Sequence, residues 1–240
     1  MGGAVTKNND IINSWERNAA LWTTVVREGA IPSRAAGTDQ AIIAAVKALR
    51  PRHILDIGCG EGWLVRHLAD DLGCEAAGTD GSAALIESAQ AAHQGGTYML
   101  QTYETLAAQP GQLGGPYDAV ICNFSLLGRD IAPILAAAMR SLAPDGTLLI
   151  QTLHPSAASG EAAYADGWRN ETFASFTSGD WVPMPWYFRT FGSWFAVFKA
   201  VDLVVTAVDE PINQASGKPL SVIFHCTAKD PREWDDVKQR

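Results

Sequence analysis

The segment Ile54-Leu-Asp-Ile-Gly-Cys-Gly-Glu-Gly62 passes from a short apolar run directly into three closely spaced glycines. The apolar run begins at His53 and is typical of a buried strand, and a helical pattern follows over 63–72. Glycine permits a positive φ and a close approach of the backbone, so the three glycines favour a tight strand-to-helix turn. Backbone amides in such a turn face a ligand at the N-terminus of the helix. The segment therefore predicts a ligand-binding turn at the carboxyl end of a strand.

Outward from this turn, strand-like and helix-like segments alternate along the chain, which favours a parallel, doubly wound sheet. The predicted strands are 53–57, 75–79, 97–101, 117–122, 147–152, 203–208 and 220–227. The predicted helices are 10–29, 40–49, 63–72, 82–93, 131–142 and 190–199. No helix fits between the last two strands, so we expect them to form an antiparallel hairpin at the sheet edge. We predict a Rossmann-like α/β fold, with a seven-stranded sheet that is mostly parallel and has one antiparallel edge strand.

One domain is expected to span residues 1–240, with two segments covering the sheet. Residues 10–35 are predicted to form an N-terminal helical cap. Residues 155–189 are rich in Gly, Ser, Pro and aromatic residues and show no clear periodicity. A loop of this length inside a domain is usually functional, so we predict an inserted aromatic lid.

The composition of the chain limits its possible partners. The net charge is −8 and no cluster of Lys and Arg is visible, which disfavours a nucleic-acid substrate. The N-terminus is polar and no apolar run is long enough for a membrane span, so we expect a cytoplasmic protein. The four cysteines show no metal-ligand spacing, so we expect no metal site and buried free thiols.

Two aspartates define the kind of ligand that the glycine turn would bind. Asp56 lies two residues before the first glycine, where its carboxylate would repel a pyrophosphate but would suit an amino group and a sulfonium. Asp80 ends the second predicted strand, about twenty residues further on, where an acid can bind ribose hydroxyls. Nicotinamide and flavin enzymes use a similar turn, and Asp56 disfavours them.

Over roughly residues 50–155 the chain resembles the class I S-adenosylmethionine-dependent methyltransferases, including the bacterial quinol and small-molecule group. The motifs that carry the resemblance are Ile54 to Gly62, Asp80, Tyr117-Asp-Ala-Val-Ile-Cys-Asn123 and Leu142-Ala-Pro-Asp-Gly-Thr-Leu-Leu-Ile150. The resemblance implies S-adenosylmethionine as cofactor and S-adenosylhomocysteine as product. It also implies a cofactor site formed by Arg34, Asp56, Gly58, Cys59, Gly60, Asp80, Gly81, Thr102, Tyr103, Asn123 and Phe124.

Within that implied site, Asp56, Gly58 and Gly60 line the methionine part of the cofactor and Asp80 holds the ribose. Thr102 and Tyr103 flank the adenine, whereas Asn123 and Phe124 border both cofactor and substrate. Arg34 meets the cofactor carboxylate in members similar to the quinol O-methyltransferases, although a solvated surface arginine is the alternative. Cys59 is small enough to serve packing alone, and Gly62 is open to the same interpretation.

The residues that bind the methyl acceptor are expected after the fifth strand. His154 ends that strand and is the candidate catalytic base, because histidine exchanges a proton near neutral pH. The alternative is a histidine that hydrogen-bonds a nearby loop. Aromatic rings can stack on a flat or apolar acceptor, and arginine can hold a carboxylate. The candidate substrate-binding residues are Trp22, Trp168, Arg169, Trp186, Tyr187 and Arg189.

The leading hypothesis is methyl transfer from S-adenosylmethionine to an oxygen or nitrogen atom of a small aromatic or apolar molecule, without a metal. We expect the protein to act as a monomer or a homodimer. The alternative is a non-catalytic S-adenosylmethionine-binding sensor or partner subunit. A nicotinamide oxidoreductase is the third hypothesis.

Overall fold

The computed structural model describes residues 2–228, so the last part of the predicted 1–240 domain lies outside the described residues. Seven strands form one sheet in the order β3-β2-β1-β4-β5-β9-β8. Their bounds are β1 His53–Ile57, β2 Glu75–Asp80, β3 Thr97–Leu100, β4 Tyr117–Asn123, β5 Leu142–Leu153, β8 Leu203–Asp209 and β9 Ser221–Ala228. This sheet confirms the predicted Rossmann-like fold.

The last two strands, β8 and β9, form the predicted antiparallel hairpin at one side of the sheet. Their connection is too short for the crossover that a parallel pair would need. β9 pairs antiparallel with both β5 and β8, whereas β1 to β5 pair parallel with one another. β9 is therefore inserted between β5 and the edge strand β8, so the antiparallel strand is next to the edge of the sheet.

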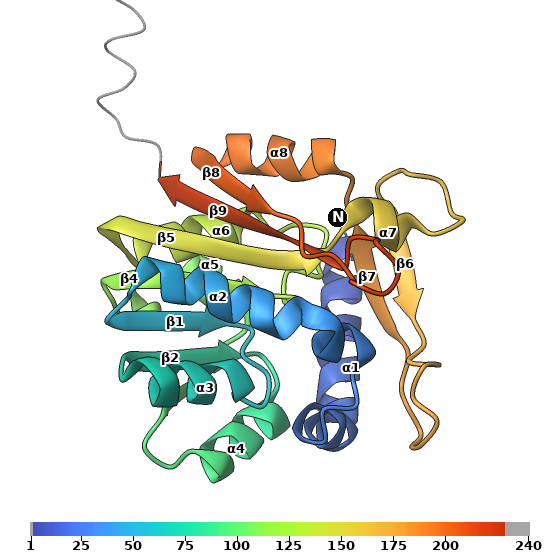
Figure 1. Ribbon diagram of the computed structural model, residues 1–240, viewed down its shortest axis with the longest axis horizontal. Helices are drawn as coiled ribbons and strands as arrows, with labels where there is room; N and C mark the ends of the chain where they lie inside the picture. Colours follow the sequence, from blue (N-terminus) through green and yellow to red (C-terminus); the bar gives the residue numbers. More distant parts are fainter. Residues whose placement is uncertain (1, 229–240) are drawn as a thin grey trace, which may run out of the picture.

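Helices cover both faces of the sheet (Figure 1). α2 (Asp39–Leu49) and α3 (Trp63–Leu72) pack on one face, with α4 (Ala83–Ala92) beside α3. α5 (Tyr103–Ala108), α6 (Ala132–Arg140) and α8 (Phe191–Ala200) pack on the other. Neighbouring strand residues alternate between the two cores: Ile54 faces α2 and α3, whereas Leu55 faces the opposite core. Burial on both faces explains the near-continuous apolar strands.

Short polar motifs set the starts of three helices. Ser82 accepts a hydrogen bond from the amide of Leu85 and caps α4, as its position in the sequence indicates. Thr102 and Thr190 cap α5 and α8 in the same way. α5 was not predicted, because a helix of 6 residues is too short to show a repeating apolar face. Two short turns complete the helical elements, a 3₁₀ turn (Pro110–Leu113) and a π-helical turn (Arg34–Thr38).

The segment predicted as a loop over 155–189 contains regular structure, so that part of the prediction was wrong. It begins with α7 (Pro155–Ser159) and includes a two-stranded antiparallel sheet of β6 (Gly167–Glu171) and β7 (Met184–Phe188). Pro185 stands within β7, and proline is tolerated in such a strand only at an edge. The pairing also spans a long connection, and neither strand alone shows the apolar alternation of a half-buried strand.

α1 (Gly2–Arg27) begins earlier than the predicted helix and lies across the carboxyl ends of the strands (Figure 1). Its Asn18 exchanges hydrogen bonds with the backbone of Val182: Nδ2 donates to the carbonyl over 2.8 Å and Oδ1 accepts from the amide over 2.9 Å. Ser14 donates to the same carbonyl over 3.0 Å. Because Ser14 and Asn18 are buried, these bonds join α1 to the connection between β6 and β7.

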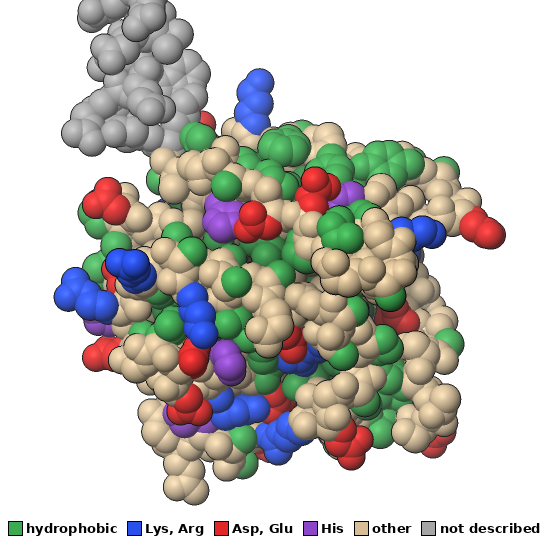
Figure 2. Space-filling model, in the orientation of Figure 1, with side chains coloured by type: hydrophobic (Ala, Val, Ile, Leu, Met, Phe, Trp, Pro, Cys, Tyr) green, Lys and Arg blue, Asp and Glu red, His purple; other side chains and the backbone are tan. Residues whose placement is uncertain are grey.

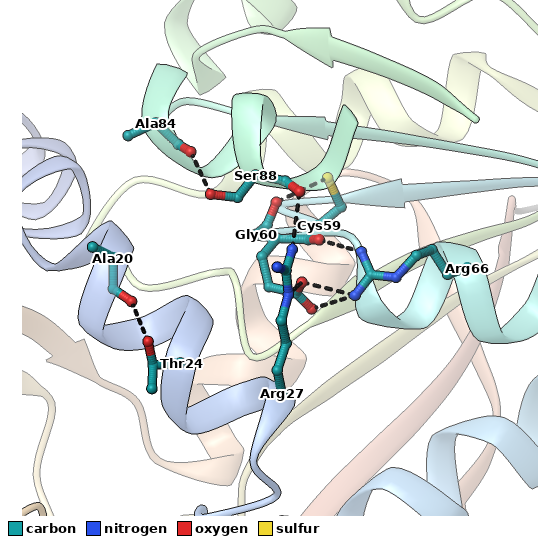
Figure 3. Close-up of polar contacts among 9 residues, drawn as sticks. Ala20, Thr24, Arg27, Cys59, Gly60, Arg66, Ala84 and Ser88 are labelled. Atoms are coloured by element: carbon teal, nitrogen blue, oxygen red, sulfur yellow. Dashed lines mark hydrogen bonds and ion pairs between the residues drawn. The ribbon is translucent and has the colours of Figure 1, made fainter. Parts of the chain in front are cut away.

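A buried carboxylate fixes the other end of α1 to the glycine turn. Arg27 from α1 and Arg66 from α3 converge on the turn from opposite sides (Figure 3), and both donate to the carboxylate of Glu61 at distances of 2.7–3.0 Å. The Glu61 side chain is 0% exposed. Arg27 also donates to the carbonyl of Ser88 in α4 over 3.0 Å. Sequence reasoning passed over Glu61, one of whose partners, Arg27, comes from a distant element.

Replacing Glu61 by Gln is expected to lower the free energy of unfolding by about 2–3 kcal/mol, because Arg27 and Arg66 would lose the charge that they share. Urea-induced unfolding measures the change. Asp71→Asn is the matched control: it removes an ion pair with Lys47 whose two side chains are well exposed, so stability should hardly change. Equal effects of the two substitutions would contradict the role of the buried carboxylate.

Candidate functional site

A cavity of about 680 Å³ lies at the carboxyl ends of the strands. Part of its lining comes from the turn after β1 and from the ends of β2 and β4. A further part comes from α1 and from the region 173–189, which supplies much of the aromatic surface. The cavity therefore joins the predicted cofactor residues to the predicted lid.

Glycine is required at two points of the turn after β1. Gly58 has φ +80°, and a Cβ there would overlap the Cβ of Ser125 and lie 3.1 Å from Tyr103 Oη. Gly62 has φ +79°, and a Cβ there would lie 2.7 Å from Tyr98 Cε1. Gly58 therefore keeps the turn close to the end of β4, whereas Gly62 serves the packing of α3 against β3, as its alternative interpretation held.

Asp80 lines the cavity and is held there by hydrogen bonds from backbone amides. Its Oδ2 accepts from the amide of Gly60 and its Oδ1 from the amide of Ser82, both over 2.9 Å. Burial raises the pKa of Asp80, and these amides oppose the shift. Each oxygen keeps a second lone pair, so the carboxylate can still accept from two neighbouring hydroxyls. Gly81 follows it in the cavity lining.

Asp56 is buried beside Asp80 and does not itself line the cavity. Its Oδ1 has no hydrogen-bond partner among the described residues. Burial and the neighbouring Asp80 carboxylate raise the pKa of Asp56 to about 8. A nearby cation would favour the ionised form, so this position suits a positively charged ligand group.

The end of β4 and the start of α5 form a further part of the lining. Asn123 lines the cavity, and its Oδ1 is buried with no partner in the described part of the chain. Phe124 has φ +52°, a conformation that non-glycine residues rarely adopt and that concentrates at functional sites. Tyr103 donates to the carbonyl of Ser125 over 2.9 Å, and Thr102 lines the cavity next to it. Both residues line the cavity, and their role beside an adenine stays a prediction.

Ser125 is a site residue that sequence reasoning missed. Its hydroxyl donates to the carbonyl of Ile57 over 2.7 Å, and so ties the end of β4 to the end of β1. Its place directly after Asn123 and Phe124 was the available signal. Cys59 lines the cavity and packs against Gly78, where a Cβ would lie 2.7 Å from its Sγ, so its small size is needed for packing.

Arg34 reaches the cavity but is not a free cation. Its Nε lies 2.8 Å from both carboxylate oxygens of Asp39, and its guanidinium carbon lies 4.0 Å from the ring centroid of Trp63. The side chain is 16% exposed, so the alternative of a solvated surface arginine does not describe it. The ion pair fixes the guanidinium at the cavity wall.

His154 is held away from the cavity by its own hydrogen bonds. Its Nε2 lies 2.7 Å from Glu210 Oε1 and its Nδ1 lies 2.8 Å from Ser156 Oγ. The residue is buried against Phe191 and is not part of the cavity lining. Because both ring nitrogens are engaged, this geometry does not support His154 as the catalytic base. It matches the alternative of a histidine that hydrogen-bonds a nearby loop.

The predicted substrate residues separate into two groups. Trp22, Trp186, Tyr187 and Arg189 line the cavity. Trp168 and Arg169 do not, because the hairpin places them elsewhere: Trp168 packs edge-on against Tyr187, and Arg169 stacks 3.7 Å from the ring centroid of Phe188. The cavity adds aromatic residues that sequence reasoning did not assign to it, namely Phe173, Phe176 and Trp194.

Comparison with known proteins finds similarity to methyltransferases. Residues 54–146 match the family model described as a methyltransferase domain. No curated protein matches the chain.

Among solved structures, the fold is similar to an S-adenosylmethionine-dependent methyltransferase from Clostridium acetobutylicum (TM-score 0.59, 13% identity, covering 90% of this chain and 99% of that one). It is also similar to magnesium protoporphyrin IX methyltransferase from Synechocystis with bound S-adenosylhomocysteine (TM-score 0.53, 18% identity, 82% and 83% covered). A third similar structure is a glycopeptide N-methyltransferase complexed with sinefungin (TM-score 0.63, 15% identity, 81% and 87% covered). The chain thus has the fold of the S-adenosylmethionine-dependent methyltransferases, and the segment that matches the methyltransferase-domain model contains the glycine turn.

Gly58→Ala tests the tightness of the turn, with Gly73→Ala as the matched control. Both glycines have a positive φ, but a Cβ on Gly73 would meet nothing within 4 Å. We expect Gly73→Ala to lower the free energy of unfolding by about 1 kcal/mol from backbone strain alone. Gly58→Ala should cost about 1–3 kcal/mol more, because Ser125 must move. Urea unfolding of both variants is the measurement. Equal losses of unfolding free energy would contradict the close approach of Gly58 to Ser125.

Proposed function

We propose that this protein transfers a methyl group from S-adenosylmethionine to an oxygen or nitrogen atom of a small aromatic or apolar molecule. One observation carries the proposal: the same cavity is lined by the glycine turn with Asp80 and by the aromatic side chains of α1 and 173–189. A cofactor held at the turn would therefore share one cavity with an acceptor held among the rings.

The residues at the turn fit S-adenosylmethionine. The spare lone pairs of Asp80 suit two ribose hydroxyls, and Tyr103 and Thr102 are placed to flank an adenine. The unpartnered Oδ1 of Asp56 suits a cationic ligand, and the fixed guanidinium of Arg34 suits the ligand's carboxylate. When bound, this cofactor supplies a methyl group on a sulfonium, which an acceptor can attack directly.

The chain's own contribution is chiefly position and exclusion of water. Aligning two bound reactants supplies a large part of the rate enhancement of a bimolecular reaction. The aromatic side chains around the cavity keep the reacting atoms away from bulk water. The supporting rings are Trp15, Trp22, Phe173, Phe176, Trp186 and Tyr187. No proton-transfer role is assigned to His154.

A small-molecule acceptor agrees with the surface of the protein. On the face drawn in Figure 2, lysine and arginine side chains are scattered among acidic ones, and the net charge is −8. Nucleic-acid binding depends on basic surface, so neither feature favours it. Among residues 2–228, none of the helices combines the length and the apolar character needed to cross a membrane.

Binding of S-adenosylmethionine at pH 7 is expected to release about one proton more from the wild type than from Asp56→Asn. With a pKa of about 8, Asp56 is mostly protonated in the empty site at pH 7, and a bound cation favours its ionised form. Affinity should therefore rise with pH up to about 8 and then level off. Titration calorimetry in two buffers of different ionisation enthalpy counts the protons, and equal release from both proteins would contradict the assignment.

The proposed function is tested by titrating the protein with S-adenosylmethionine and S-adenosylhomocysteine. Wild type should bind both, and Asp80→Ala should bind about 100-fold more weakly, because two hydrogen bonds to a charged group are lost. Asp145→Ala, at an exposed position near the start of β5, is the control and should bind like the wild type.

Formation of S-adenosylhomocysteine in the presence of a panel of small phenols and amines then tests transfer. Failure of the wild type to bind either compound would overturn the proposal. Binding without transfer to any acceptor would instead favour a sensor or partner subunit.

A further inference from the structure

Arg189 is a buried cation at the wall of the cavity. It follows β7 directly, is 3% exposed and lines the cavity. Its Nη2 donates to the carbonyls of Gly128 and Arg129 over 2.6 and 2.5 Å, which uses both N–H groups of that nitrogen. Its Nη1 is buried and has no hydrogen-bond partner among the described residues. The side chain is thus fixed by one nitrogen while another is left without an acceptor.

The charge of Arg189 is also unpaired. Within residues 2–228, no carboxylate lies within 4.0 Å of its guanidinium. Asp166 and Asp130 are acids whose charges act on Arg189 and raise its pKa, and both are exposed to solvent. Burial lowers the pKa of Arg189 to about 10, so it remains a cation at neutral pH. A buried cation without a partner is costly for a protein to keep.

The other arginines near the cavity differ in this respect. Arg34 is paired with Asp39, and Arg27 and Arg66 share Glu61. Arg169 lies on the neighbouring strand but outside the cavity, where its Nη1 donates to the carbonyl of Ala158. Arg189 therefore combines burial, a place in the cavity lining and an unused donor.

Two aromatic rings lie close to the guanidinium of Arg189. The guanidinium carbon of Arg189 lies 5.0 Å from the ring centroid of Tyr187 and 5.3 Å from that of Trp194, and both rings line the cavity. A flat apolar body fits such walls, and a guanidinium nitrogen beside it fits an attached anion. Nη1 is buried without a partner in the described part of the chain, and a carboxylate, with two oxygens, needs fewer donors than a phosphate, so a single such nitrogen suits a carboxylate better.

We propose that Nη1 of Arg189 binds a carboxylate carried by the methyl acceptor, so that the acceptors are aromatic or apolar carboxylic acids. This inference rests on the proposed function in one respect: the acceptor enters the same cavity. The carboxylate anchors the acceptor at the end of β7, and the aromatic walls hold its body. The bonds from Nη2 to the two carbonyls fix the guanidinium beforehand, which reduces the entropy lost on binding.

The test compares carboxylic acids with their uncharged amides, using protein saturated with S-adenosylhomocysteine. The probes are 1-naphthoate and indole-3-acetate against 1-naphthamide and indole-3-acetamide, titrated by calorimetry and by ligand-observed NMR. Wild type is expected to bind each acid at least about tenfold more tightly than its amide. Arg189→Gln should lose this preference. Arg169→Gln removes a cation outside the cavity and should retain it.

Several outcomes overturn the inference. They are equal or tighter binding of the amides by wild type, no binding of either acid at millimolar concentration, and an acid preference that persists in Arg189→Gln. Circular dichroism and S-adenosylhomocysteine binding verify that Arg189→Gln is folded. If this variant does not fold, the comparison of acid with amide binding by the wild type tests the inference. S-adenosylhomocysteine binding without an acid preference refutes this inference alone. An acid preference in free protein that binds no S-adenosylmethionine or S-adenosylhomocysteine refutes the proposed function alone.

Discussion

The carboxylate of Asp80 holds together the part of the molecule from which the rest of the site is built. Its two oxygens accept from the amides of Gly60 and Ser82, so one side chain fixes both the glycine turn and the start of α4. Ser82 in turn donates to Glu16 of α1 over 2.6 Å. The shape of the turn, the position of α4 and the docking of α1 therefore depend on one acid at the end of β2.

The sheet and the cofactor side of the cavity were predictable because their signals are local. The apolar run before Gly58 and the acid at Asp80 each belong to one strand end, and parallel strands bring such ends together. Asn123 and Tyr103 were implied by the resemblance to a known family, and both line the cavity near strand ends. A short range of sequence therefore carries enough information to place these residues, even though their contacts are distant along the chain.

The acceptor side was less predictable because its structure depends on contacts between distant segments. The composition of 155–189 indicated aromatic residues near the site but not the β6–β7 pairing, which decides that Trp186 lines the cavity and Trp168 does not. His154 was placed at the correct strand end, but its orientation depends on Glu210, which belongs to the connection between β8 and β9. Only the folded chain brings such partners together.

The exchange of hydrogen bonds between Asn18 and the backbone of Val182 has a consequence for how the cavity wall can change. α1 and the connection between β6 and β7 are held together as a strand is held to its neighbour, although one partner is a side chain. A residue inserted near Val182 would shift the amide and the carbonyl that Asn18 binds, and would misalign the helix. The shape of this part of the cavity wall can therefore change only if α1 and the connection between β6 and β7 change together.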